Sequence, residues 1–414
     1  MAAPAAVAGQ TYTLEQCKQM AVAHNITMSQ ATNAILQAKE TSREALTKFF
    51  PTISAQGMAF DLNRSLIDMN ILGRIPINLV KDGWLAGVNA VQPIFAGGEI
   101  VNTNKLAKLG VKSAETEREQ SAHTTSLTAE TYFYQVVALK EKAKTLQTLD
   151  RQLKAINKDV SEYVKAGIAQ RNDLMQVQLR ENDVESQQAN LDNNLKLAKM
   201  LLAQYIGLGT GEADVACSLS DSLPLFPLAL KKDHEAALAA TPEYRLLEQN
   251  VEGQKIRKRL AVGANLPKVA VGAGYNSNNV ISNSTNNRGL VFATVNVPIS
   301  GWWGGAHSIR RGQLAVENAQ QQMKDRSELL VINMQRCWND VENAYKQLAI
   351  AHKSIAQSQE NLRLNNDYYR AGTSSMTDLM TAETQYQQSR DKYVDAYIAY
   401  LISITRYRQA TNQD

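Results

Sequence analysis

Aromatic residues are scarce in this chain: they make up 6% of its 414 positions, whereas Gln, Asn and Ala are abundant. A compact enzyme of this length would usually need more large apolar side chains to build its core. The composition therefore indicates a protein with much solvated helix surface around a thin core.

Cysteine and an excess of charge are missing as well. Cys17, Cys217 and Cys337 lie at least 120 residues apart, which supports neither a disulfide framework nor a metal site. Gln16 stands where a lipid-attachment motif would place a small residue before Cys17. The 44 Lys and Arg residues against 40 Asp and Glu residues give a net charge of +4, which argues against a nucleic-acid partner.

The residue patterns that carry catalysis are missing too. The sequence has no glycine loop that would cradle a phosphate. Its histidines are scattered without the spacing of metal ligands, at His24, His123, His234, His307 and His352. We therefore expect no enzymatic activity, no catalytic residue, no metal site and no cofactor.

No long hydrophobic run predicts a helical membrane span. The longest uncharged, mostly apolar stretch has 21 residues from Gly289, which is long enough. It contains Asn296 and Pro298 and it alternates, so we interpret it as a strand, a turn and a helix start. Residues 1–10 lack the charged start and apolar core of an export signal. We expect a residual tail left after signal removal; an ordinary disordered N-terminus is the alternative.

What the sequence does contain is an internal repeat. "YVKAGIAQRNDLM" at 163–175 returns as "YYRAGTSSMTDLM" at 368–380, and "VQPIFAGGE" at 91–99 matches "NVPISGWWGG" at 296–305. Gly167 follows Pro93 by 74 residues, and Gly372 follows Pro298 by the same interval. Equal spacing between ordered landmarks predicts two tandem repeats, residues 11–207 and 231–414, joined by a linker at 208–230.

Each repeat contains a very long helical pattern. Residues 99–165 and 304–370 hold apolar residues at alternating spacings of three and four, which is typical of coiled coils. In the first repeat these residues are Leu146, Leu149, Leu153, Ile156 and Val160. A helix of this length would extend about 100 Å at about 1.5 Å per residue. Shorter helices are expected at 25–48, 171–206, 242–262 and 375–410.

The segments between the helices predict two β-hairpins, at about 51–95 and 267–299. Val291, Val295 and their alternate neighbours are apolar, whereas Phe292, Thr294 and Asn296 fall on the other face. Strands of about ten residues with this pattern suit a membrane barrel. An ordinary half-buried strand is the alternative for any one of them. Segments 61–83 and 276–289 are expected to be loops.

Tryptophans are placed where the strands would leave a bilayer. Trp84, Trp302 and Trp303 form the predicted membrane-interface belt, because the indole ring favours the boundary between lipid and water. An open four-stranded sheet leaves backbone groups unsatisfied in hydrocarbon. One chain therefore needs copies of itself to close a barrel.

In these features the chain resembles the TolC-type outer-membrane efflux and secretion channels. "FFPTI" and "NLPKV" open strands, "QPIFAGGE" and "VPISGWWGG" lead into long helices, and both tips carry "AG" before "DLM". The resemblance covers about residues 11–410. It implies a mixed membrane α+β fold, in which a homotrimer forms a 12-stranded barrel in the bacterial outer membrane and an α-helical barrel in the periplasm.

The resemblance also implies a function and partners. The trimer would be a passive exit duct of a tripartite efflux pump or a type I secretion system, with the linker in an equatorial region. Its periplasmic tips would meet an adaptor of the membrane fusion type, coupled to an inner-membrane RND or ABC transporter. A soluble or periplasmic coiled-coil scaffold without channel activity is the alternative.

The tips have a local interpretation of their own. Gly167 and Gly372 are expected to end helices in a left-handed turn. Asn172 and Thr377 are expected to be N-caps of the return helices. The acidic residue that follows each of these caps would favour the positive end of the helix dipole.

Further roles at the tips come from the resemblance. Asp378 matches a gate carboxylate, while Thr381 stands where some members have a second one. Asp173 and Tyr369 match positions that latch the closed mouth, and Ser374 stands where some members have an Arg partner. The predicted adaptor contacts are Ala166, Gly167, Ile168, Ala371, Gly372 and Thr373.

Overall fold

A computed structural model describes residues 11–65, 67–71, 75–79, 81–280 and 285–413. The tail predicted for residues 1–10 lies outside them. The chain divides into two compact units that alternate along the sequence. The first unit contains Thr116–Arg245 and Asp325–Asp414 together with the chain up to Asn33, and the second contains Ala34–Glu115 and Leu246–Lys324.

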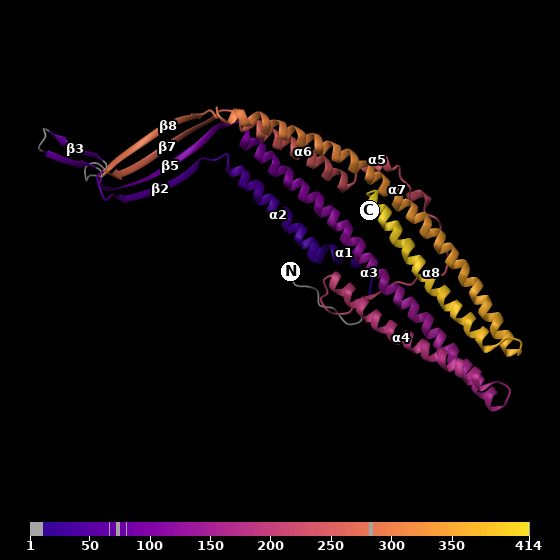
Figure 1. Cartoon of the computed structure of the whole chain (residues 1–414). Coiled ribbons are helices and arrows are strands. Elements are labelled where there is room, and N and C mark those ends of the chain that lie inside the picture. Colours follow the sequence, from indigo (N-terminus) through magenta and orange to yellow (C-terminus); the bar gives the residue numbers. More distant parts are fainter. Residues whose placement is uncertain (1–10, 66, 72–74, 80, 281–284, 414) are drawn as a thin grey trace. The chain divides into compact units, whose positions relative to one another are not determined.

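The described part of the chain consists mainly of helices (Figure 1). The helices are α1 (Leu14–His24), α2 (Ile26–Thr47), α3 (Glu99–Lys165), α4 (Arg171–Tyr205), α5 (His234–Leu238), α6 (Pro242–Gly263), α7 (Gly301–Arg370) and α8 (Met376–Ala410), with a 3-10 turn η1 (Leu228–Leu230). The strands are β1 (Thr11–Tyr12), β2 (Thr52–Asp61), β3 (Ile67–Ile71), β4 (Ile75–Leu79), β5 (Asp82–Ala96), β6 (Asp214–Val215), β7 (Lys268–Asn279) and β8 (Asn286–Asn296).

The coiled-coil pattern of the long helices is buried in the first unit, as the sequence predicts. Leu146, Leu149 and Leu153 of α3 pack against Val184 of α4, and all four are at most 4% exposed. In α7 the buried residues of the same pattern include Trp338, which packs beside tyrosines of α8. None of the described helices combines the length and hydropathy that a membrane span requires.

The main sheet belongs to the second unit. Its strands lie side by side in the order β2, β5, β7, β8 (Figure 1), and every neighbouring pair is antiparallel. The register between β5 and β7 shifts once, between Pro93 and Phe95. The two predicted hairpins are thus joined to each other through β5 and β7, and β2 and β8 form the two edges.

The two faces of this sheet differ in chemistry. The register places one mainly apolar set on a common face: Ile53, Ala55, Trp84, Val88, Ala90, Val271, Ala273, Tyr275, Val291, Ala293 and Val295. Val291 and Val295 of this set are 83% and 67% exposed. The opposite face is mixed: it carries the polar residues Ser54, Gln56, Asn89, Asn276, Asn278, Thr294 and Asn296 together with the apolar residues Met58, Phe60, Leu85, Val91, Leu290 and Phe292.

Two glycines on this mixed face make room for asparagine side chains of the neighbouring strand. A Cβ at Gly87 would lie 2.0 Å from the side-chain oxygen of Asn276, and one at Gly274 would lie 2.2 Å from that of Asn89. Any larger residue at either glycine would displace an amide. The glycines therefore keep the polar side chains flat against the sheet.

The loop predicted at 61–83 is wrong in part. It contains β3 and β4, which form an antiparallel pair from Ile67 opposite Leu79 to Ile71 opposite Ile75. The stretches "IDMNI" and "IPINL" alternate with period two, but their polar residues and Pro76 concealed the pattern. The segment predicted as a loop at 276–289 likewise includes the end of β7 and the start of β8.

The linker between the repeats is held to α8 by a row of tyrosines. Tyr393 and Tyr400 donate hydrogen bonds to the carbonyl oxygens of Ser220 and Leu225, at 2.8 and 3.4 Å. The Tyr407 hydroxyl accepts from the backbone N–H of Lys232 at 2.9 Å. Because the tyrosines recur every seven residues, one face of α8 fixes the linker and the first residues of the second repeat.

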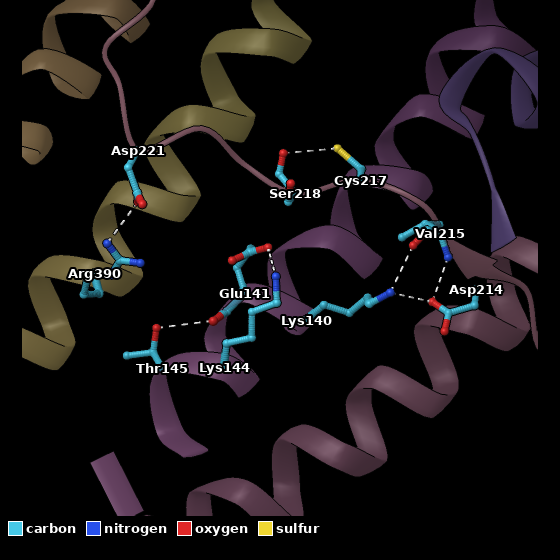
Figure 2. A network of polar contacts seen from close by, with 10 residues as sticks. All are labelled: Lys140, Glu141, Lys144, Thr145, Asp214, Val215, Cys217, Ser218, Asp221 and Arg390. Carbon is cyan, nitrogen blue, oxygen red and sulfur yellow. Dashed lines mark hydrogen bonds and ion pairs between the residues drawn. The ribbon is translucent and has the colours of Figure 1, made fainter. Parts of the chain in front are cut away.

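A charged cluster fixes the start of the linker (Figure 2). The Asp214 carboxylate accepts from Lys140 at 2.9 Å and from Lys199 at 3.1 Å. Burial acts to raise the pKa of Asp214, but the hydrogen bonds from Lys140, the Val215 N–H and Lys199 outweigh it and lower the pKa. Asp214 thereby joins the linker to α3 and α4, beside the parallel pair of β1 and β6.

Candidate functional site: the two helical hairpin tips

The two tips have the same backbone turn. Gly167 and Gly372 both have φ +73°, which confirms the predicted left-handed helix ends. The N–H of Ile168 donates to the Tyr163 carbonyl at 2.8 Å, and the N–H of Thr373 donates to the Tyr368 carbonyl at 2.9 Å. In both tips the N–H of a residue thus bonds the carbonyl five positions earlier, which satisfies one of the last carbonyl oxygens of α3 and of α7 in the same way.

The N-caps predicted at Asn172 and Thr377 are wrong. Gln170 and Ser375 occupy the N-cap positions of α4 and α8, two residues earlier. The acidic residue of each tip is the third residue of its helix, from which a side chain reaches back to the cap N–H. In the sequence, the signal for the N-cap of α8 is Ser375 followed three residues later by Asp378.

The acidic residues of the two tips are held differently. The Oδ2 atom of Asp378 accepts from the Ser375 hydroxyl at 2.6 Å, from the Ser375 N–H at 3.2 Å and from the Ser374 hydroxyl at 3.3 Å. Asp173 accepts from the Gln170 N–H at 3.3 Å. The hydrogen bonds from the Ser375 hydroxyl and N–H lower the pKa of Asp378, whose side chain is exposed. Tip 2 (residues 368–380) therefore presents a fixed, readily ionised carboxylate.

The packing beneath the tips differs as well. Met376 and Leu379 at the start of α8 are each 1% exposed and pack with Val160 and Val177. At the equivalent positions of tip 1 (residues 163–175), Arg171 is exposed and Leu174 is only partly buried. The start of α8 is therefore part of a core among α3, α4 and α7, whereas the start of α4 lies nearer the surface.

The residues predicted for a latch are only partly brought together. Burial raises the pKa of Tyr369, and the negative charge of Asp173 raises it further, so the two groups are near enough to interact electrostatically. Ser374 donates to Asp378 within its own tip. Thr381 donates to the Thr377 carbonyl of its own helix at 2.8 Å.

The predicted adaptor contacts are accessible. Ala166, Gly167, Ala371, Gly372 and Thr373 are exposed, and Ile168 is 77% exposed at the end of tip 1. A large apolar side chain with that exposure is costly to leave in water. Ile168 is the most exposed of the large apolar side chains of the two tips, ahead of Met175 at 52% and Tyr368 at 51%.

Sequence reasoning missed a polar bridge between the two hairpins. Arg180 of α4 donates through Nε to Glu383 Oε2 of α8 at 2.8 Å and through Nη2 to Gln387 at 2.6 Å. Lys142 of α3 contacts Asp395 of α8 at 2.8 Å. The available signal was a charged residue between the buried Val177 and Val184, at helical spacing, where a solvated face would not be expected.

The tryptophans predicted for the membrane interface lie on elements of the second unit. Trp84 of β5 is opposite Asn279 of β7 and is 37% exposed. Trp302 and Trp303 lie in the first turn of α7 and are 48% and 80% exposed. The Trp302 indole donates to the Asn265 carbonyl at 2.9 Å.

A family model described as outer membrane efflux protein matches residues 18–208 and 235–413. No curated protein matches the chain. The chain is similar to the outer membrane protein VceC of Vibrio cholerae, with 13% identity, a TM-score of 0.77, and 96% of this chain and 95% of that chain covered.

Two solved channels are similar to the same degree. The CmeC outer membrane channel of Campylobacter jejuni has 14% identity and a TM-score of 0.79, with 98% of this chain and 90% of that chain covered. The open state of the MtrE outer membrane channel of Neisseria gonorrhoeae has 14% identity and a TM-score of 0.77, with 96% and 88% covered. At these identities the likeness concerns the fold.

The match to the family model is evidence of family membership and not of the fold alone. It spans both repeats, and its two matched ranges are separated by 209–234, where the linker lies. The resemblance that the repeated tips and the strand–helix junctions suggested is thereby confirmed. The chain belongs to the outer membrane efflux protein family, whose members are the outer-membrane exit ducts of efflux pumps.

Proposed function

We propose that three copies of this chain form a passive duct that spans the outer membrane and continues into the periplasm. The main sheet of each copy contributes four strands to a 12-stranded barrel, and the long helices form the periplasmic α-helical barrel. The tips close the periplasmic mouth. Asp378 of each copy contributes to a ring of carboxylates there, which attracts cations and repels anions.

The observation that carries the proposal is the two-faced sheet. One face is mainly apolar and carries large side chains that are exposed in the single chain, and the other face combines amides and hydroxyls with apolar side chains. Apolar residues outward and polar residues inward are the pattern of a membrane barrel around water. Strands of 10 to 15 residues span about 33–50 Å at about 3.3 Å per residue, enough for a tilted crossing of about 30 Å of hydrocarbon.

The edges of the sheet support assembly. β2 and β8 each have one neighbour in the sheet, so each has a row of backbone groups directed away from it. In hydrocarbon these groups need partners. Pairing of β8 of one copy with β2 of the next closes a ring and satisfies them.

Membership of the family supports the proposed partners. An adaptor of the membrane fusion type contacts Ala166–Ile168 and Ala371–Thr373, and an inner-membrane RND or ABC transporter supplies the energy. Trp84, Trp302 and Trp303 lie at the two lipid–water boundaries. The soluble scaffold alternative leaves the exposed apolar face of the sheet without an explanation.

Reconstitution tests this function. The purified protein should elute as a trimer in detergent, and in a planar bilayer it should give a small conductance that is mostly closed. A protein that never inserts, or that elutes as a monomer in detergent, would contradict the duct, and one that stays soluble without detergent would favour the scaffold alternative.

A further inference from the structure

The two units of the chain differ in charge. By sequence, the second unit (Ala34–Glu115 and Leu246–Lys324) has 18 Lys and Arg residues against 10 Asp and Glu residues, whereas the rest of the chain has 26 against 30. A nearly balanced chain is thus made of a basic unit and an acidic one. The basic unit is the one that contains the main sheet and its exposed, mainly apolar face.

Three lysines of the basic unit lie in a row near the start of α3. Lys105, Lys108 and Lys112 are spaced three and four residues apart, which places them on one face of the helix. All three residues are exposed. Within the described ranges, no ion pair joins Lys105 or Lys108 to a carboxylate, whereas Lys268 of the same unit is paired at 2.7 Å. This lysine row therefore presents positive charge at the surface of the unit.

The two flanks of α3 are occupied by neighbouring helices of the unit. On one flank, Asn104 donates to the Ala45 carbonyl of α2 at 2.7 Å. On the other flank, a Cβ at Gly253 of α6 would lie 3.6 Å from Leu109 and 4.0 Å from Leu106. Around the helix, the lysine row falls between these two flanks. It therefore points away from both neighbouring helices.

The side to which the row points follows from the ion pair of Lys268. The register places Lys268 opposite Asn296, on the mixed face of the main sheet. Glu99 pairs with Lys268 from the first turn of α3, so Glu99 lies on the side of that face. At 3.6 residues per turn, the lysine row lies about 180–240° around α3 from Glu99. The row therefore continues the mainly apolar face of the sheet.

The lysine row also lies close to the end of the sheet. Ala96, Lys268 and Asn296 are opposite one another there, and α3 begins three residues after Ala96. At about 1.5 Å per residue, the row extends from about 9 to about 20 Å along α3. In the proposed duct, this end of the sheet is at the periplasmic boundary of the bilayer. The headgroup region extends about 5–8 Å beyond the hydrocarbon, and charges act over a Debye length of about 8 Å. The upper part of the row is thus near the headgroups.

We propose that the lysine row binds anionic phospholipid headgroups of the periplasmic leaflet. This inference rests on the proposed duct function. A polybasic segment beside a bilayer attracts anionic lipids, and each Lys or Arg near the surface raises the affinity about fivefold. The row has the complementary charge and adjoins the face that the duct presents to lipid. If these lysines served solubility alone, the protein would not distinguish headgroups of different charge.

Quenching of tryptophan fluorescence by lipids with brominated acyl chains tests the contact. Brominated phosphatidylglycerol or brominated phosphatidylcholine is titrated into the purified trimer in a neutral detergent. Trp302 and Trp303 report binding, because they are 48% and 80% exposed at the start of α7. The wild type should bind phosphatidylglycerol about tenfold or more tightly than phosphatidylcholine. About 1 M salt should abolish this preference.

A triple variant removes the row: Lys105→Gln, Lys108→Gln and Lys112→Gln. It should lose most of the preference for phosphatidylglycerol and keep the wild-type affinity for phosphatidylcholine. Gln has nearly the helix propensity of Lys, so α3 should stay folded. The matched control should keep the preference. It exchanges three exposed lysines of the first unit that form no ion pair within the described chain: Lys158→Gln, Lys346→Gln and Lys353→Gln.

The lipid contact is contradicted if the wild type binds both lipids alike, if the row variant retains the preference, or if the control variant loses it equally. A conducting trimer without a preference for phosphatidylglycerol overturns the lipid contact alone. A protein that binds this lipid through the row but forms no channel contradicts the duct, so the two failures are distinguishable.

Discussion

Tip 1 and tip 2 have the same turn in different surroundings. Gly167 and Gly372 share one φ value and the same pattern of backbone bonds. Yet Leu379 is buried where Leu174 is partly exposed, and Asp378 accepts three hydrogen bonds at its Oδ2 where Asp173 accepts one from its cap. The repeat thus preserves what the backbone requires, because a left-handed turn restricts the residue type, and allows the side-chain environment to diverge.

From this difference we expect the two tips to have different roles in the proposed duct. Tip 2 is anchored by packing and by a fixed carboxylate, which suits a gate element. Tip 1 presents Ile168 and an exposed return helix, which suits contact with a partner. Paired substitutions at equivalent positions measure how far this asymmetry goes.

The largest asymmetry is expected from the two leucines. Leu379→Ala removes a side chain that is 1% exposed and should destabilise the fold by about 2–5 kcal/mol, through lost burial and a cavity. Leu174→Ala should cost less than half as much, because solvent already reaches that side chain. Thermal melts followed by helical circular dichroism measure the order. Equal shifts would show that the tips are packed alike.

A smaller asymmetry is expected from the caps. Ser375→Ala removes the hydroxyl that bonds both the N–H and the carboxylate of Asp378, and should cost about 1 kcal/mol. Gln170→Ala keeps the backbone N–H that donates to Asp173, so its melting temperature should stay close to that of the wild type. If Gln170→Ala lowers the melting temperature more than Ser375→Ala does, Gln170 and not Ser375 is the stronger cap.

The smallest effect is a dependence on pH. Folding lowers the pKa of Asp378 from its usual value of 3.8. The carboxylate therefore stabilises tip 2 above that pH, and the contribution is lost as the pH falls through the lowered pKa. The melting difference between wild type and Asp378→Asn should be present at neutral pH and fade below 3.8. The melts are recorded in about 1 M salt, where the Debye length is about 3 Å, so that repulsion among the Asp378 carboxylates of the three copies is screened. If the difference in melting temperature persists in stronger acid, the stabilisation does not come from the ionised carboxylate of Asp378.

The sequence predicted those features that depend on local chemistry or on periodicity. The left-handed glycines, the buried heptad of α3 and the two faces of the main sheet all follow from residue type and spacing. The N-caps were misplaced by two residues, because Asn172 and Thr377 are also good capping residues and only the bond to the third helical residue distinguishes them.

Contacts between residues far apart in the chain could not be predicted from the sequence. Arg180 and Glu383 are separated by 203 positions, and no local pattern indicates that their helices meet. The same is true of the tyrosines that hold the linker. Side-chain charge alone would have placed Arg180 on a solvated face, whereas the structure encloses it between two apolar clusters.

The most direct test of the account is the ion preference of the reconstituted trimer. Reversal potentials in a salt gradient across a planar bilayer should show a preference for cations in the wild type. Asp378→Ala should reduce that preference, and Asp173→Ala should leave it nearly unchanged, because only the carboxylate of tip 2 is assigned to the gate. If both substitutions change the preference equally, or if neither does, the assignment of the gate to tip 2 is contradicted.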